Sequence, residues 1–423
     1  MKFKFWKLFV IGFGFFGISI LWPLYNAYVP IFLKDFSLSS FSIGIVMTID
    51  NIFAIFMLPI LGTLSDQTRT KFGRRMPYIM LGAPLAAFFF ILIPFIKDFN
   101  NLFFLMFIII LMNFFMAIFR SPVVALMPDI TPSRYRSQAN GIINFMGGLG
   151  ALLAYFAGKP MYDYSQSLPF IVGAIVMLAA QLLLFVFIKE PKEYTIKSNL
   201  SKNKKSVVKK GMQELLTNLK DVFVSKEKSL LLMLLSILFW FIGFNSIETF
   251  FTIYAKFHVG IPESTGALMM GVFSLTFMIF AIPAGFIGGK FGRKKSIFAG
   301  IFILFIMSLS TFYFGNMDMS IESNKELFKT IMYIIFPIGG IGWALINVNS
   351  LPMVVDMTTT EKSGGYTGLY YFFSMAANIF APPIAGFFMD IFDYNSLMIF
   401  SFIFFLLSFI TMLFVKRGEA QKI

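Results

Sequence analysis

Long apolar runs, separated by short polar breaks, are the feature of this sequence that most restricts its fold. An α-helix needs about 20 apolar residues to cross the hydrocarbon core of a bilayer, and runs of this length recur along the chain. Of 423 residues, 58% are hydrophobic and 13% charged, too few polar groups to cover a soluble protein. The sequence predicts an all-α membrane protein with twelve transmembrane helices, at residues 5–32, 40–64, 77–97, 101–125, 139–158, 168–188, 229–255, 265–288, 297–316, 328–352, 367–389 and 395–415.

Missing and rare residue types exclude several classes of function. The chain has no cysteine, which excludes disulfides, thiol catalysis and cysteine-ligated metals, and its one histidine, His258, argues against a histidine metal cage. No nucleotide-binding loop or nucleophile elbow is present, so we expect no enzyme activity, no cofactor and no metal. Residues 5–32 lack a small-residue cleavage site, so we interpret them as the first span and not as a signal peptide.

The net charge of +14 is explained by its placement relative to the spans. With both termini on one side, the loops of that side carry 28 Lys and Arg residues and the opposite loops carry six. This asymmetry is the positive-inside rule, so we expect a multi-pass protein of the bacterial cytoplasmic (inner) membrane with both termini cytoplasmic. The basic excess then reflects orientation in the lipid bilayer, and a nucleic-acid partner is not expected.

The longest break in the apolar pattern divides the spans six and six. We expect an N-terminal six-helix bundle at 1–188, a basic cytoplasmic linker at 189–228, and a C-terminal six-helix bundle with a cytoplasmic tail at 229–423. Apolar residues between 208 and 223 fall at helical spacing. They are compatible with an amphipathic helix on the anionic leaflet and equally with a solvated linker.

Two pairs of motifs repeat between the halves. GTLSDQTRTKFGRRMP (62–77) follows the second span and GFIGGKFGRKK (285–295) follows the eighth, while Asp129-Ile-Thr and Asp356-Met-Thr follow the fourth and tenth. The offsets, 223 and 227 residues, nearly agree, which indicates duplicated six-helix units that rock during transport. We expect a cytoplasmic latch in these loops, with a purely topogenic basic loop as the alternative. Its gating residues would be Gly62, Asp66, Gly73, Arg74, Arg75, Asp129, Arg136, Gly285, Gly292, Arg293 and Asp356.

These motifs resemble those of a known family. The 62–77 loop is similar to the signature of the glycoside–pentoside–hexuronide:cation symporters, within the major facilitator superfamily, and most of all to the sucrose-type bacterial branch. SPVVALMPDITP (121–132), with Arg136 and Asn140 beyond it, and the segment 342–371 also resemble this group. The resemblance spans essentially the whole chain. It implies the major facilitator fold, with two pseudo-symmetric six-helix bundles, and cation-coupled uptake of a glycoside or disaccharide.

The chain departs from this family at its coupling positions. Melibiose-type carriers place an aspartate of their sodium site directly before the proline of helix 2, where this chain has Leu58 before Pro59. Plant sucrose carriers have a coupling aspartate on helix 4, at the position of Asn113 here. The resemblance therefore predicts the fold and the substrate class better than it predicts the coupling residues. The two departures favour proton coupling over sodium coupling.

Three ionisable residues fall clearly inside the predicted spans, away from their ends: Asp50, Arg120 and Glu248. Such groups are costly in hydrocarbon and mark function by default. A carboxyl group there can bind and release a proton as water access alternates, so we interpret Asp50 and Glu248 as proton-coupling residues. The alternative for each is a structural carboxylate bound by a neighbouring Asn. Arg120 could bind sugar hydroxyls or pair with a carboxylate, or it could reach the cytoplasmic headgroups.

Sugars are bound by amides and hydroxyls, with aromatic rings against their apolar faces. Candidates at suitable depth, besides Arg120, are Tyr25, Asn26, Asn113, Asn144, Trp240, Asn245, Asn347, Asn349, Tyr370 and Asn378. Any one of these asparagines could instead join two helices. We therefore expect a monomeric transporter that imports a disaccharide or glycoside together with a proton. Sodium in place of the proton is left open. The alternative is a transporter of the same fold that exports drugs or sugars.

Overall fold

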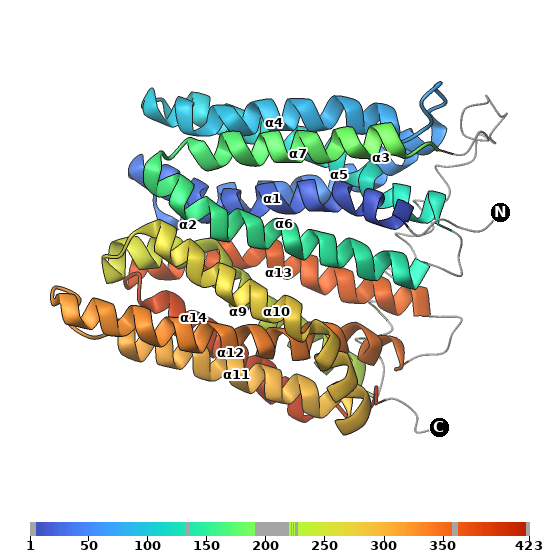
Figure 1. The fold of residues 1–423 in the computed structure, drawn as a ribbon. Helices are drawn as coiled ribbons and strands as arrows, with labels where there is room; N and C mark the ends of the chain where they lie inside the picture. The colour runs from blue at the N-terminus through green and yellow to red at the C-terminus, as the bar shows by residue number, and fades with distance from the viewer. Residues whose placement is uncertain are drawn as a thin grey trace. The chain divides into compact units, whose positions relative to one another are not determined.

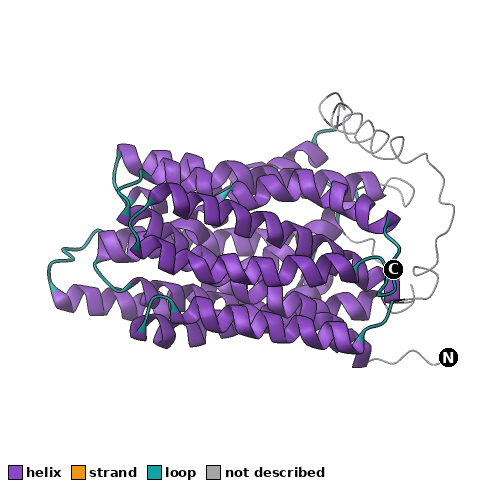
Figure 2. Cartoon of the chain, turned by 90° about the horizontal axis from the view of Figure 1, so that it is seen from above, coloured by secondary structure: helices purple, strands orange, loops and turns teal. Residues whose placement is uncertain are grey.

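The computed structural model describes residues 6–131, 136–190, 227–357 and 363–419, together with Lys220, Val222 and Val224. These residues form helices joined by short loops, and no strand is assigned in the described ranges (Figure 2). Eleven described helices are long and apolar enough to cross a membrane, and a shorter apolar stretch covers Ser40–Ile55. Counted with this stretch, the spans match the twelve predicted, so the predicted fold class is confirmed. The linker helix considered for 208–223 lies almost wholly outside the described residues.

The chain divides into two compact units. Unit 1 comprises Met1–Ser37 and Ile49–Lys202, and unit 2 comprises Leu38–Thr48 and Asn203–Ile423. The helices of unit 1 are α1 (Trp6–Asp35), α3 (Ile49–Gln67), α4 (Met76–Asp98), α5 (Leu102–Ile130), α6 (Arg136–Tyr164) and α7 (Leu168–Phe187). Those of unit 2 are α2 (Ser40–Met47), α9 (Ser229–Ile253), the π-helix η3 (Tyr254–Val259), α10 (Glu263–Phe291), α11 (Arg293–Gly315), α12 (Glu322–Val355), α13 (Ser363–Ile391) and α14 (Ser396–Leu413).

Helix packing inside the two units follows one pattern (Figure 1). In unit 1, α1 packs on α6 and α7, α5 packs on α3 and α4, and α4 packs on α7. In unit 2, α9 packs on α13 and α14, α12 packs on α10 and α11, and α11 packs on α14. The pairs correspond one to one in chain order. The duplication predicted from the loop motifs is therefore present in the packing of the helices.

The second predicted span is not one continuous helix, as the sequence suggested. It is interrupted at Thr48, between α2 and α3. The Thr48 hydroxyl donates to the carbonyls of Gly44 and Ile45 at 2.9 and 2.8 Å. A threonine hydroxyl that bonds back in this way competes with the helical hydrogen-bond ladder, which accounts for the break.

The seventh span also differs from its prediction. It continues past residue 255 as η3 and ends at Gly260, in the left-handed conformation (φ 75°). A ring nitrogen of His258, Nε2, lies 2.9 Å from the Gly315 carbonyl, so it donates to that oxygen. The His258 ring also stacks on Tyr254, with centroids 5.1 Å apart. The only histidine therefore joins η3 to the end of α11. Short π-helical segments are rare and are frequent at functional sites.

Candidate functional site

Unit 1 contains a polar group within its apolar spans. Asn113 of α5 is 1% exposed, and its Nδ2 donates to the Tyr25 hydroxyl of α1 at 3.3 Å and to the Ile109 carbonyl at 3.0 Å. Asp50, in the first turn of α3, accepts from Asn51 Nδ2 at 2.8 Å. Its charge acts on Arg120 and on Tyr25, so these side chains are electrostatic neighbours. Arg120 lies two helical turns after Asn113 on α5, which places both on one face.

This polar group has unsatisfied hydrogen-bonding capacity. Asn113 Oδ1 and Trp22 Nε1 are buried without a hydrogen-bond partner among the described residues. Trp22 also packs edge-to-face on Tyr25, with centroids 5.7 Å apart. Buried polar atoms normally have partners, and an orphan atom is a place where a ligand or water can bind. Of the residues predicted from the sequence, Asp50, Tyr25, Asn113 and Arg120 come together here. Trp22 was missed, although it is one helical turn from Tyr25.

Unit 2 contains a second polar group. Asn245 Nδ2 of α9 donates to Asn378 Oδ1 of α13, in a short hydrogen bond. Glu248 follows Asn245 by three residues on α9, on the same helix face, and is half-buried. Tyr370 bonds to the Ser350 hydroxyl at 3.0 Å. The predicted residues Asn245 and Asn378 are therefore direct partners, with Glu248 one turn away.

Aromatic rings lie beside this group in unit 2. Phe244 stacks on Trp343 with centroids 4.0 Å apart and an angle of 17°, and on Phe273 at 5.3 Å and 28°. Trp343 also meets Phe241 edge-to-face at 5.4 Å. None of these four rings was among the predicted site residues. The abundance of phenylalanine in the chain made individual rings indistinguishable from packing residues.

The other predicted binding residues are placed separately. Asn349 is 3% exposed and donates to the backbone carbonyls of Ala284 and Leu345, so it joins α10 to α12. Asn347 donates to the Trp343 carbonyl of its own helix at 3.2 Å. Trp240 is fully buried, and its Nε1 has no partner among the described residues. Asn26 is half-buried and Asn144 is exposed.

An ion-pair cluster fastens one end of unit 1, which we term its basic end. The Arg74 guanidinium donates to Asp129 at 2.5 and 3.1 Å, and Arg75 Nε donates to Asp129 at 2.9 Å. The Glu190 carboxylate accepts the backbone N–H groups of Arg74, Arg75 and Met76 at 2.8–2.9 Å, at the start of α4. Gly73 adopts φ 113°, and a side chain there would overlap Glu190. The loop, the end of α5 and the end of α7 are thereby tied together.

Unit 2 repeats this arrangement at its own basic end. Arg293 pairs with Asp356, and the Glu419 carboxylate accepts the backbone N–H groups of Arg293 and Lys294 at 2.8 and 3.0 Å. Gly292 adopts φ 101° beside Glu419, as Gly73 does beside Glu190. Gly285 of α10 lies beside Val348 of α12. Two members of these clusters, Glu190 and Glu419, were missed from the sequence. Both are acidic residues that follow the sixth helix of a half.

Three predicted gating residues cannot be placed in these clusters. The surroundings of Gly62 and the side chains of Asp66 and Arg136 lie outside the part of the chain that the structure describes.

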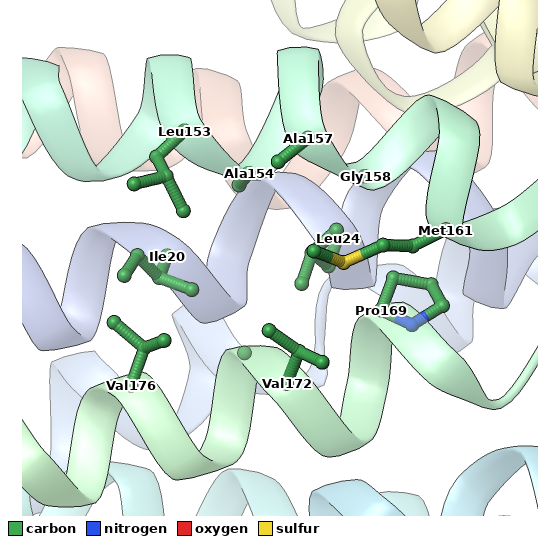
Figure 3. Close-up of a pocket in the computed structure, with 11 residues that line it drawn as sticks. Ile20, Leu24, Leu153, Ala154, Ala157, Gly158, Met161, Pro169, Val172 and Val176 are labelled. Atoms are coloured by element: carbon green, nitrogen blue, oxygen red, sulfur yellow. The ribbon is translucent and has the colours of Figure 1, made fainter.

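A small apolar depression lies between α1, α6 and α7 in unit 1 (Figure 3). Ile20 and Leu24 line it on α1, and the Leu24 side chain packs against Gly158 of α6 and Gly173 of α7. Its lining contains none of the polar residues predicted to bind substrate. It is therefore separate from the polar groups described above.

Comparisons with known proteins agree on the superfamily. The family model described as Major Facilitator Superfamily matches residues 8–321 and 256–422. The quinolone resistance protein NorA of Staphylococcus aureus (strain MSSA476) is 22% identical over 401 residues, covering 91% of this chain and 90% of that protein. The class H tetracycline resistance protein of Pasteurella multocida is 22% identical over 289 residues, covering 66% of each. Both names describe drug resistance, whereas the sequence motifs suggested sugar uptake.

Solved structures share the fold. A mutant form of the nucleoside transporter NupG superposes with a TM-score of 0.74 at 14% identity, covering 97% of this chain and all of that one. A bacterial homologue of the human lysosomal transporter Spinster, inward-facing and occupied, gives 0.70 at 11% identity, covering 98% of this chain and 96% of that one. At such identities the likeness concerns the fold alone.

Proposed function

Since the chain belongs to the major facilitator superfamily and is a secondary transporter of that type, we propose that it exports drug-like organic compounds in exchange for protons. The substrate class and direction are supported by the two drug-resistance relatives. This interpretation replaces sugar import, the first expectation from the motifs, as the leading proposal.

The observation that carries the proposal is the charged group of unit 1. Asp50 and Arg120 are electrostatic neighbours within apolar spans, where isolated charges are expensive. A proton that binds Asp50 removes the negative charge beside Arg120, so protonation changes what Arg120 can bind. Such a change is what a proton-coupled cycle requires. Glu248, beside the Asn245–Asn378 pair, is the corresponding candidate in unit 2.

The aromatic group of unit 2 supports an organic substrate with a planar ring. Phe244, Trp343 and Phe273 form a continuous stack on three helices. Aromatic faces bind planar apolar surfaces through offset stacking, and the neighbouring amides can orient a polar substituent. This combination is compatible with a substrate that carries an aromatic ring and a polar substituent.

Export is tested in a bacterial strain that lacks its own drug pumps. Expression of the chain should lower accumulation of a fluorescent quinolone, and a protonophore should restore it. D50N and R120A should each reduce the export rate about tenfold, equivalent to roughly 1.4 kcal/mol in the barrier. D98N is the matched control, because the Asp98 carboxylate is 74% exposed at the end of α4. Unchanged quinolone accumulation with the chain expressed, or full export by D50N, would refute the proposal.

The second candidate is proton-coupled import of a disaccharide or glycoside. It is favoured by the 62–77 loop and by the hydrogen-bonded side chains Tyr25–Asn113 and Asn245–Asn378, which resemble polyol-binding groups. In proteoliposomes with an imposed pH gradient, import would concentrate a labelled disaccharide, and a protonophore would abolish the gain. Export predicts no such gain and quinolone movement in its place.

We also propose that the two basic-end clusters act as latches during the cycle. Each ties the start of one helix to the ends of two others through charged hydrogen bonds. Because such bonds can be exchanged for bonds to water, a latch of this kind can form and release.

A further inference from the structure

A tight turn presents one cation and one aromatic ring at the basic end of unit 1. Thr70 and Gly73 exchange backbone hydrogen bonds of 3.2 and 2.9 Å, and the Thr70 hydroxyl donates to the Gly73 carbonyl at 2.8 Å. The same hydroxyl oxygen accepts from the Phe72 N–H at 3.2 Å. Hydrogen bonds of this kind fix a turn, so Lys71 and Phe72, both exposed, stand at the tip of a rigid support.

Three exposed rings gather beside this turn at the end of α7. Phe72 packs on Phe185 of α7 with ring centroids 5.7 Å apart, and Trp6 of α1 meets Phe187 of α7 edge-to-face at 6.2 Å. Phe72, Trp6 and Phe187 are 43%, 46% and 50% exposed, so each ring packs on one side and leaves the other side open. Because α7 is an apolar helix of 20 residues, its end lies at the level of the lipid headgroups.

Two lysines border these rings. Lys71 Nζ lies 5.2 Å from the ring centroid of its neighbour in the turn. Lys189 is exposed and follows the last ring of α7 by two residues. The next residue, Glu190, packs against Gly73, which brings this segment beside the turn. We call the surface formed by Trp6, Lys71, Phe72, Phe187 and Lys189 the ring–lysine patch.

The ring–lysine patch carries positive charge. Lys71 and Lys189 have no ionic partner among the residues that the structure describes. Two carboxylates of the same end are already bound, since Glu190 accepts three backbone N–H groups and Asp129 pairs with two arginines. An anion that approaches the patch therefore meets two ammonium groups without a competing carboxylate in the described part of the chain.

The basic end of unit 2 differs at the corresponding place. A single residue separates α10 from α11, which leaves no room for a four-residue turn. Lys294 Nζ donates to the carbonyls of Leu413 and Val415 at 2.9 and 2.6 Å, so its charge is used inside the unit. Lys290 is exposed and lies 5.4 Å from the ring centroid of Phe291, which has no ring partner in the described part of unit 2. The combination of two lysines with several rings is therefore a feature of unit 1.

We propose that the ring–lysine patch binds the headgroup of an anionic glycerophospholipid. The two ammonium groups bind the phosphate, and the open ring faces lie against the glycerol and the first methylenes of the acyl chains. Charge and rings together select this ligand, because a soluble anion would use the charge alone. The basic end is expected to be cytoplasmic, where the leaflet is anionic. This inference goes beyond the proposed function, since it concerns the bilayer and holds for either direction of transport.

Native mass spectrometry of the delipidated protein tests the binding without a transport assay. Phosphatidylglycerol should bind at least about tenfold more tightly than phosphatidylcholine. A lysine near an anionic surface contributes about fivefold, so K71Q/K189Q should lose at least about tenfold in affinity for phosphatidylglycerol. K290Q is the matched control, because Lys290 is also exposed beside a ring at a basic end, and it should keep the parental affinity. No preference in the parental protein, or equal losses in K290Q and K71Q/K189Q, would overturn the proposal.

Trp6 reports on the ring–lysine patch within a bilayer. Its fluorescence is the difference between the parental protein and W6F, measured in vesicles that contain brominated phosphatidylglycerol or brominated phosphatidylcholine at equal mole fraction. The anionic lipid should quench it at least about twofold more, and soluble glycerol phosphate should not relieve the quenching. Equal quenching by the two lipids, or relief by glycerol phosphate, would contradict a lipid site. If neither quinolone nor disaccharide moves, the proposed function fails, while these measurements still decide whether the lipid binds.

Discussion

Replacing Glu190 by alanine should strongly destabilise unit 1. The residue is 7% exposed, and its carboxylate accepts three backbone N–H groups at the start of α4. Hydrogen bonds to a charged group contribute about 1.5–3 kcal/mol each, but three that share one carboxylate are not additive. Loss of an N-cap costs up to about 2 kcal/mol, and a carboxylate at a partly buried helix start adds a similar amount. The expected loss for E190A is therefore about 3 kcal/mol.

The second unit supplies a matched comparison. Glu419 accepts only two N–H groups and is exposed, so E419A should cost about 1 kcal/mol. At roughly 2–4 °C per kcal/mol for units of this size, E190A should lower the unfolding temperature by about 6–12 °C and E419A by about 2–4 °C. Thermal unfolding of the purified protein in detergent, followed by intrinsic fluorescence, measures both. E190Q keeps one acceptor oxygen and should fall between wild type and E190A. Equal shifts for E190A and E419A would refute the reasoning, because burial would then make no difference.

Three further predictions concern neighbouring groups. G73A should cost about 1–3 kcal/mol, because φ 113° is strained for alanine and its Cβ would overlap Glu190; G289A, inside α10, whose Cβ would meet nothing within 4 Å, should not lower the unfolding temperature. D129N weakens the bonds to both Arg74 and Arg75 and should slow export about tenfold in proteoliposomes, with D98N again unaffected; parental export by D129N would rule out the latch. Burial opposes the charge of Glu227, but the Ser229 hydroxyl and N–H and the Arg417 guanidinium outweigh it and lower the pKa of Glu227 from its ordinary 4.5. The stability that this carboxylate contributes is thus present above pH 4.5 and lost as the pH falls through the lower folded value, so the unfolding temperatures of wild type and E227Q should differ at pH 6 and converge in acid.

The fold could be predicted because lipid imposes a simple rule on the sequence. Each backbone group in the bilayer core must be satisfied within its own helix, so apolar length translates directly into spans. The interruptions could not be predicted in the same way. The break at Thr48 depends on a hydrogen bond from the Thr48 hydroxyl to the Gly44 carbonyl. The extension of the seventh span to Val259 depends on a π-helical segment. Neither feature changes the hydropathy of the sequence, so hydropathy alone does not predict it.

The candidate site could be predicted where charged residues lie inside apolar spans or repeat between the two halves. Asp50 and Arg120 stood out because hydrocarbon excludes ions, and the structure makes them neighbours. Arg74 and Asp129, and Arg293 and Asp356, stood out because they repeat, and each pair is joined. Glu190 and Glu419 carried no such signal. An acidic residue beyond the last helix of a half is common in sequences and predicts no contact. Only the fold shows that it accepts backbone N–H groups at the start of a helix more than 100 residues earlier.

That return has a consequence for how the protein is made. The N-terminus of α4 is completed by a residue 116 positions later, and that of α11 by one 126 positions later. At a synthesis rate of 5–20 residues per second, each of these helices waits roughly 6–25 s for its acidic partner. The start of α4 is therefore completed only after Glu190 has been synthesised, and the start of α11 only after Glu419, so the two caps form in two successive stages.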